Sequence, residues 1–325
     1  MPANAPQLLH SYRLNPDGRG TILDLSGLES WRPADGSIWV HLDIADAAAY
    51  NWLTREGGVP ENAVDTLLAE ETRPRSTVTD QGLLIVLRGV NTNPGDDPED
   101  MVSVRVWIDA NRVISTQRRR LLSIIDISTA LNAGNGPCSP GALLAMLVER
   151  LADRIGDFVD SIENRLDAAE DEIGNADAAK FRPRLASLRR QIAAVRRFLA
   201  PQRDALDRLN RQPVVLFDEG DAHALRQEAD RITRYLEDLE LARERTVVLQ
   251  EELLSHMAQQ QNARMYVLSV VAAIFLPLTF VTGLLGMNVG GLPGLDNPAA
   301  FGLSIVIMVL AGAGLLAFFR WKKWL

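Results

Sequence analysis

The sequence predicts an α/β domain, long stalk helices and two C-terminal transmembrane helices. Three observations lead to this fold class. Short β-rich runs alternate with Gly, Pro and Asp turns in the first 140 residues, the apolar period then becomes helical, and two long uncharged apolar runs come near the end of the chain. These changes of pattern define six expected parts: a cytoplasmic α/β domain (1–140), a cytoplasmic helical hairpin (141–217), a stalk helix continuing into the first transmembrane helix (218–286), an external loop (287–298), a second transmembrane helix (299–319) and a basic cytoplasmic tail (320–325).

The first expected part contains three β-rich runs, at 37–43, 83–91 and 102–117, and one helical stretch at 61–71. This mixture of strands and a helix predicts an α/β domain. The segment "NAGNGPCSPG" (132–141) has the composition of a linker.

The helical hairpin is predicted by apolar residues at 3.6-residue spacing on two successive segments. The first stripe is Leu144, Leu147, Leu151, Ile155, Phe158, Ile162, Leu166 and Ile173, and the second is Phe181, Leu185, Leu188, Ile192, Val195 and Leu199. "GNAD" (174–177) should turn the chain between them. The acidic run 167–172 near this turn has two interpretations, an ion-paired solvated face or a cation-sensing tip.

A third helix should begin near Asp218 and continue into the membrane, because no helix breaker occurs before Pro277. Its first part has apolar residues at 4-3 spacing: Leu225, Ala229, Ile232, Leu236 and Leu239. Within the apolar part, one face carries polar or small residues: Asn262, Met265, Ser269, Ala272, Leu276, Thr279 and Gly283. This stripe predicts either close helix packing or a pore lining, and a pore would need several chains around one axis.

The two apolar runs, 266–286 and 299–319, are each long enough to span a membrane, since 21 residues of helix reach about 31 Å. Asp296 is the only charged residue between Arg264 and Arg320. Because basic residues flank the spans and the connecting loop has no Lys or Arg, both termini should be cytoplasmic. The N-terminal stretch shows no signal peptide pattern, so a multi-pass protein of the bacterial inner membrane is expected.

Composition narrows the class of function. The net charge of −8 argues against nucleic-acid binding and is compatible with attracting cations, and a single cysteine, Cys138, excludes an intramolecular disulfide. The sequence contains no phosphate-binding glycine loop with Lys, no metallohydrolase His cluster and no nucleophile elbow. We therefore expect that the protein is not an enzyme and binds no cofactor.

The segment "TGLLGMNVGGLPG" (282–294) follows the first apolar run. Its Gly286, Met287 and Asn288, at the outer end of the first of two C-terminal spans, resemble the signature of the CorA superfamily of divalent metal transporters, the two-transmembrane Gly-x-Asn proteins. "VGGLPG", "ETRPR" (71–75), "LRGVN" (87–91) and "DMVSVRVW" (100–107) are similar to the zinc transporter ZntB branch. This similarity covers nearly the whole chain.

The resemblance implies a funnel-shaped homopentamer in the bilayer, with five copies of the first span around a pore. Five Asn288 side chains would then place a ring of neutral amide oxygens at the outer mouth, where a hydrated divalent cation could bind and leave. The transported ion would be Zn²⁺, with Cd²⁺, Ni²⁺ and Co²⁺ as further candidates. A magnesium or cobalt channel of the CorA type and a membrane-anchored metal sensor without flux are the alternatives.

Zn²⁺ usually takes His, Cys and carboxylate ligands, and the expected pore stripe offers none of these. A Zn²⁺ ion passing along it should therefore stay largely hydrated. Outside the stripe, His256 follows Glu252 by four residues, which places both on one helix face as a candidate metal pair or a surface hydrogen bond.

Overall fold

The computed structural model describes residues 8–70, 72–175, 178–211, 216–287 and 298–322. The chain divides into two compact units, Met1–Gln250 (unit 1) and Glu251–Leu325 (unit 2). Glu71, Asn288, most of the expected external loop and the last residues of the basic tail lie outside the described residues. Each unit is described by itself below.

Unit 1 contains a seven-stranded mixed sheet with the order β2-β1-β3-β7-β6-β5-β4. All neighbouring strands are antiparallel except β3 and β7. The strands are β1 (Leu8–Leu14), β2 (Gly20–Ile22), β3 (Ser37–Asp43), β4 (Arg75–Thr79), β5 (Gly82–Gly89), β6 (Val102–Ile108) and β7 (Arg112–Gln117). The three β-rich runs of the sequence are therefore confirmed as strands, and the third of them is a hairpin of two strands.

One face of the sheet packs against short helices. These are α1 (Leu25–Ser30), the 3-10 helix η1 (Pro33–Asp35), α2 (Ala47–Arg55) and α3 (Glu61–Leu68). Trp52, Leu53 and Leu67 of α2 and α3 join Val40 and Trp107 of the sheet in one buried apolar cluster. Residues that alternate along a strand face opposite sides, so Trp39 and His41 point to the other face.

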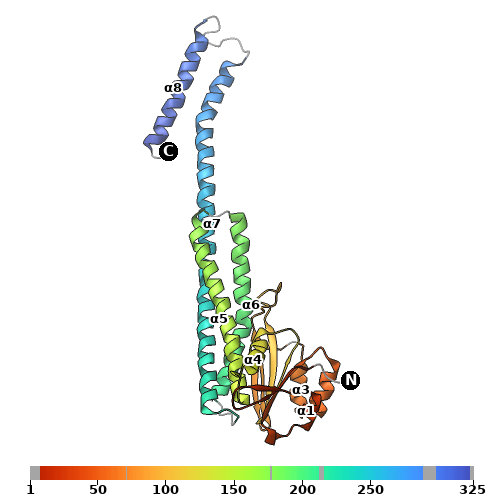
Figure 1. The fold of residues 1–325 in the computed structure, drawn as a ribbon. Coiled ribbons are helices and arrows are strands. Elements are labelled where there is room, and N and C mark those ends of the chain that lie inside the picture. The colour runs from red at the N-terminus through yellow and green to blue at the C-terminus, as the bar shows by residue number, and fades with distance from the viewer. Residues whose placement is uncertain (1–7, 71, 176–177, 212–215, 288–297, 323–325) are drawn as a thin grey trace. The chain divides into compact units, whose positions relative to one another are not determined.

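The other face is covered by α4 (Leu122–Ala133), the first turns of α5 (Pro140–Glu172) and the last turns of α6 (Ala178–Arg211) (Figure 1). Tyr12 of β1 lies 3.1 Å from Ser128 of α4 through their hydroxyl oxygens. The linker expected at 132–141 is shorter than its composition suggested, because α4 includes Ala133 and α5 begins at Pro140. The turn between these helices uses Gly134 in the left-handed region (φ 82°), a conformation that glycine adopts without a steric penalty.

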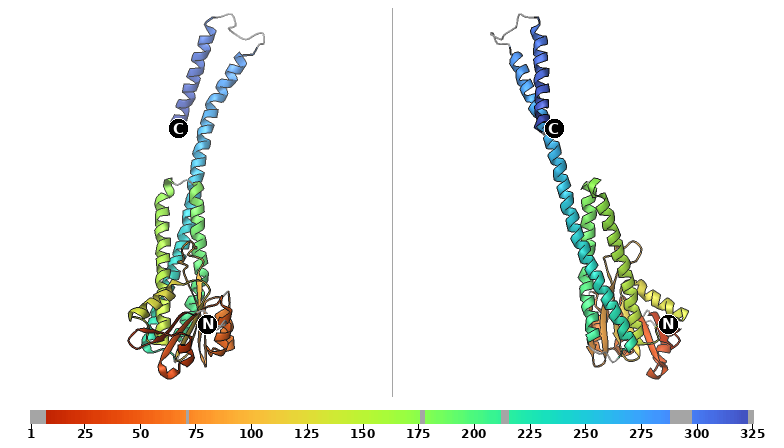
Figure 2. Two further views of the ribbon diagram at one scale, coloured as in Figure 1. Left: turned by 45° about the vertical axis from the view of Figure 1, so that its right-hand side comes forward. Right: turned by 90° about the vertical axis from the view of Figure 1, so that its left-hand side faces the viewer.

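Three long helices lie side by side in unit 1: α5, α6 (Ala178–Arg211) and the first part of α7 (Glu219–Leu285) (Figure 2). A single-turn 3-10 helix, η2 (Ile173–Asn175), follows α5. Every residue of the three apolar stripes predicted for these helices is buried. The helical period of the sequence therefore identified both the helices and their buried faces.

Unit 2 contains the rest of α7 and α8 (Ala300–Trp321). Both helices are long and apolar enough to cross a membrane. No part of the most apolar stretch of α7 is buried, and very little of that of α8 is. Helix α7 runs through Pro277 as one element.

Candidate functional site

The small and polar stripe of α7 lies on the helix face that points away from α8. Between residues 266 and 285 the only partly buried side chains are those of Val270, Ile274 and Leu278, at four-residue spacing. At about 100° per residue, Met265, Ala272, Leu276 and Gly283 lie within about 20° of the point opposite Ile274. The other members, Ser269, Thr279 and Asn262, lie within about 60° of it.

The partly buried residues of α8 and the buried Phe319 also form one stripe: Ala300, Ser304, Met308, Gly312, Leu315 and Phe319. A Cβ atom placed on Gly312 would lie 3.8 Å from Leu278 Cδ1, so these two positions are in contact distance. The α7–α8 contact therefore uses the apolar face of α7 and leaves the small and polar stripe uncovered by this chain. A small residue at 312 allows this approach.

The stripe offers neutral groups only. The Ser269 hydroxyl donates to the Met265 carbonyl at 2.9 Å, and the Thr282 hydroxyl donates to the carbonyl of Thr279 at 2.9 Å. All seven members of the stripe are exposed within this chain. Such a surface can contact a hydrated cation through its water shell, and it lacks the charged ligands that would hold the ion tightly.

Helix α7 ends immediately before the Gly-Met-Asn motif. The Gly286 amide still donates to the Thr282 carbonyl at 2.9 Å, while Met287 is past the last helical residue and exposed. Asn288 lies outside the described residues, so its predicted role at the pore mouth stays a prediction.

The second candidate for metal binding is the pair Glu252 and His256 on α7. Glu252 Oε1 and His256 Nε2 are 3.8 Å apart, and both side chains are partly exposed. Within the described ranges no group of three or more His, Cys, Asp or Glu side chains could hold a metal ion. Two ligands alone are fewer than the four of a typical structural zinc site, so this pair is a weak site by itself.

The acidic residues at the end of α5 form ion pairs with arginines of neighbouring helices. Arg245 of α7 lies 2.5 Å from Asp167 and 2.8 Å from Glu170, and Arg184 of α6 lies 2.5 Å from Glu172. These contacts favour the interpretation of this surface as an ion-paired helix face.

Three motifs that carried the family resemblance meet at Arg88, which sequence reasoning did not single out. Arg88 of "LRGVN" donates to the Thr72 carbonyl of "ETRPR" at 2.9 Å and to the Met101 carbonyl of "DMVSVRVW" at 2.8 Å. Its guanidinium stacks on the Phe198 ring of α6 at 4.0 Å, and its amide donates to Gln202 Oε1 at 2.7 Å. These contacts join the sheet to α6, and no spacing in the sequence predicts them.

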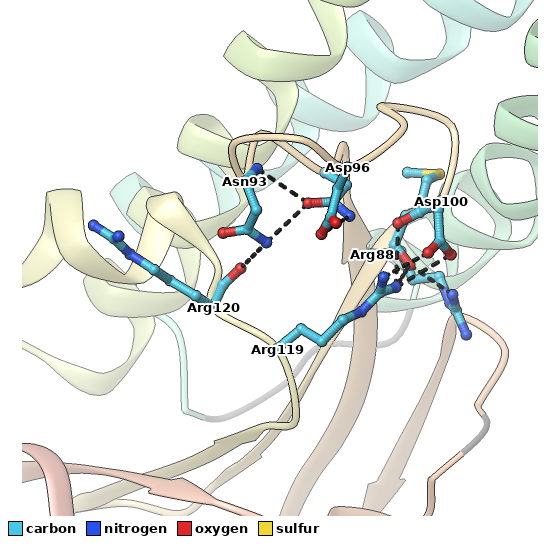
Figure 3. Close-up of polar contacts among 8 residues, drawn as sticks. Arg88, Asn93, Asp96, Asp100, Arg119 and Arg120 are labelled. Atoms are coloured by element: carbon cyan, nitrogen blue, oxygen red, sulfur yellow. Dashed lines mark hydrogen bonds and ion pairs between the residues drawn. The ribbon is translucent and has the colours of Figure 1, made fainter.

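The loop after β5 is tied to the end of β7 beside Arg88 (Figure 3). Asn93 donates to the Arg120 carbonyl at 3.1 Å, and Arg119 bonds both carboxylate oxygens of Asp100. Hydrogen bonding to Arg119 lowers the pKa of the Asp100 carboxyl. Asp100 of this acidic loop is thus paired with Arg119, which follows β7.

Comparison with known proteins places this architecture in a family. The family model of the CorA-like Mg²⁺ transporter proteins matches residues 34–323. The chain is 42% identical to the divalent cation transporter CmaX of Pseudomonas aeruginosa, over 97% of this chain and 94% of that protein. It is 36% identical to the zinc transport protein ZntB of Pectobacterium carotovorum, over 98% of this chain and 96% of the relative.

Among solved structures, the full-length CmaX protein matches with a TM-score of 0.85 at 39% identity, covering all of both chains. The similarity therefore includes the α/β domain, the long helix and the two apolar helices. The chain belongs to the CorA-like family of divalent cation transporters.

Proposed function

We propose that this protein carries Zn²⁺ across the bacterial cytoplasmic membrane through a pore at the axis of a homopentamer. The observation that supports this most directly is the position of the α7 stripe. It lies opposite the face that contacts α8, so α7 can present small and polar groups to an axis while α8 covers its apolar face. One pair of spans cannot enclose a water path, so several copies of α7 are required.

In the proposed assembly, the stripe lines the pore from Asn262 to Gly283 and the Asn288 side chains form a ring at the outer mouth. Neutral oxygen ligands and water would lower the energy of the ion without trapping it, which suits rapid passage. Both termini would be cytoplasmic, as the basic residues that flank the spans suggest.

The choice of Zn²⁺ is supported by the ZntB relatives, which are described as zinc transport proteins. Mg²⁺ is the second candidate, because the matching family model is described by Mg²⁺ transport. The two ions differ in ligand preference, and a neutral stripe that contacts only hydrated ions discriminates weakly between them. Competition between the ions is therefore part of the test.

Two adjacent alanines of α7 offer a matched pair of variants. Ala272 lies on the stripe, whereas Ala273, the next residue, lies about 80° from the centre of the stripe around the helix. In liposomes containing the purified full-length protein, Ala272→Phe should lower Zn²⁺ uptake at least about tenfold, because each subunit adds a bulky ring to the path. Ala273→Phe should leave uptake within about twofold of wild type.

Equal uptake by the two variants at equal oligomer content would contradict the proposed lining. Absence of Zn²⁺ uptake by wild-type protein that still carries Mg²⁺ would favour the magnesium alternative. A protein that binds Zn²⁺ and carries neither ion would be a sensor.

A further inference from the structure

A polar cluster joins α5 and α7 within unit 1. Arg231 of α7 donates to Asp153 of α5 at 2.8 Å, to Glu228 of its own helix at 2.9 Å and to the Tyr235 hydroxyl at 3.1 Å. Asp153 also lies 3.5 Å from Arg150. One guanidinium therefore links two carboxylates and a phenol at the surface where these helices pack.

The backbone of α5 is shaped for this contact at Gly156. A Cβ atom at position 156 would lie 2.6 Å from the Tyr235 hydroxyl, closer than real side chains approach. Glycine therefore allows Tyr235 to reach the α5 backbone beside Asp153. Glu228, Arg231 and Tyr235 follow at three- and four-residue spacing, so all three lie on the same face of α7.

Glu228 is the member of this cluster whose charge is least well compensated. Its side chain is buried, and two carboxylates of α5, Glu149 and Asp153, face it together with the single cation Arg231. Burial raises the pKa of the Glu228 carboxyl, Arg231 opposes this shift, and Glu149 and Asp153 add to it. Burial alone would lower the pKa of Arg231, but its bonds to Asp153 and Tyr235 and the charge of Glu228 raise it, so Arg231 stays charged.

We propose that Glu228 is a proton-responsive latch that sets how tightly α7 is held against α5. With Glu228 ionised, Glu228 and Asp153 share Arg231, and the repulsion of Glu228 by Asp153 and Glu149 weakens the contact between the two helices. With Glu228 protonated, the repulsion is removed and Arg231 remains bound to Asp153, so the helices pack more firmly.

The sign of the effect follows from linkage. An acid whose pKa is raised on folding binds its proton more tightly in the folded state than in the unfolded state. Its contribution to stability is complete below the ordinary Glu value near 4.5 and is lost as the pH rises through the folded value. Acidification from neutral pH should therefore strengthen the α5–α7 contact.

The consequence for transport rests on the proposed function. Helix α7 is continuous from Glu219 to Leu285 and carries the proposed pore stripe. A firmer hold on residues 228–235 restricts the helix, and conduction that needs helix movement should slow. Lower pH on the side of unit 1 should therefore reduce flux several-fold.

Glu228→Gln tests the latch, because it keeps the shape of the protonated acid and removes its titration. Glu237→Gln is the matched control, since Glu237 lies on the same helix and is exposed. Thermal unfolding of the full-length protein in detergent, from about pH 8 to about pH 5, gives the midpoint of each protein. The comparison uses the difference between the midpoints of wild type and variant, because acidification also destabilises the protein through other groups. Burial lowers the pKa of His10 and lowers that of His41 to about 3, so both histidines destabilise wild type and variants alike as the pH falls.

The wild-type midpoint should rise by a few degrees relative to Glu228→Gln as the pH falls, and Glu237→Gln should follow wild type. Glu149→Gln, which removes one of the facing charges, should move this rise to lower pH. Parallel midpoints of wild type and Glu228→Gln across the whole range would overturn the latch.

Zn²⁺ uptake into liposomes provides the second measurement. Acidification on the side of unit 1 should slow wild-type uptake several-fold, and Glu228→Gln should be slow at both pH values. The same pH response in both proteins would contradict regulation by Glu228. If wild-type protein carries no metal, the proposed function fails, and the unfolding midpoints still decide whether the latch exists.

Discussion

The two units of this chain use apolar residues in opposite ways. In unit 1, large apolar side chains such as Trp39, Leu87 and Ile155 are fully buried between the sheet and the helices. In unit 2, equally large side chains such as Phe275, Phe301 and Leu310 are exposed, at 62%, 78% and 66%. The same residue types thus find their apolar partners inside the chain in one unit and lack them in the other.

This difference shows what each unit requires from its surroundings. Burial of apolar area stabilises unit 1 at about 25 cal/mol per Å², without any partner. In unit 2 only the narrow α7–α8 contact is available, so most of its apolar surface must be covered by lipid or by other copies of the chain. The small and polar stripe of α7 is the part of this surface that suits lipid least.

The largest expected effect is the loss of stability when a buried leucine of unit 1 is truncated. An exposed leucine of unit 2 provides the matched comparison. Leu87→Ala should lower the free energy of unfolding by about 3 kcal/mol, because it leaves a cavity in a core that cannot collapse fully. Leu310→Ala, on the exposed face of α8, should change it by less than about 0.5 kcal/mol. Urea unfolding of the full-length protein in detergent measures both values.

An equal loss in the two variants would mean that Leu310 packs against another copy of the chain, so that protein rather than lipid covers this face of α8. The comparison is matched because both changes remove the same atoms.

The sequence predicted the long helices well, and the reason is physical. A helix that buries one face repeats its apolar residues every 3.6 positions, and each residue of the apolar stripes of α5 to η2, α6 and the first part of α7 is indeed buried. The apolar helices α7 and α8 were also found, because membrane spans need long uncharged runs.

Other elements could not be predicted in this way. Helix α4 has a short apolar stripe, Ile124, Ile127 and Leu131, but Ser123 and Ser128 lie on the same buried face, so the helical period of "LSIIDISTALNA" is weak. The contacts of Arg88 depend on carbonyl groups of residues far away in sequence, which have no side-chain signature. For the candidate site, the small and polar stripe of α7 could be predicted from the sequence, whereas its position opposite α8 required the structure.

The second prediction tests what unit 2 presents to the ion. Asn288→Leu would replace every amide oxygen of the proposed ring with an apolar group that cannot hold an ion or its water. A loss of about 2.7 kcal/mol of ion stabilisation at the mouth corresponds to about a hundredfold slower uptake. Zn²⁺ uptake into liposomes, after the oligomer content has been matched, measures this change.

Asn288→Asp is the companion variant, because it keeps the shape and adds a negative ring. Tighter cation binding with slower release is expected, seen as saturation of uptake at lower Zn²⁺ and a lower maximal rate. Wild-type uptake by Asn288→Leu would show that the ion passes elsewhere.

The smallest expected effect concerns the ion pairs at the end of α5, in unit 1. Asp167→Asn combined with Glu170→Gln removes both partners of Arg245, whose pKa is raised by hydrogen bonds to Glu170 and Asp167. These side chains are partly exposed, and exposed ion pairs contribute little because water and salt screen them. The double variant should therefore lower the free energy of unfolding by less than about 1 kcal/mol, and the loss should shrink further in high salt.

If the acidic residues serve only as an ion-paired helix face, the Zn²⁺ dependence of uptake will also stay unchanged. A shifted Zn²⁺ dependence with unchanged stability would instead assign a cation-sensing role to this end of α5, and the charge of unit 1 would then regulate the path in unit 2.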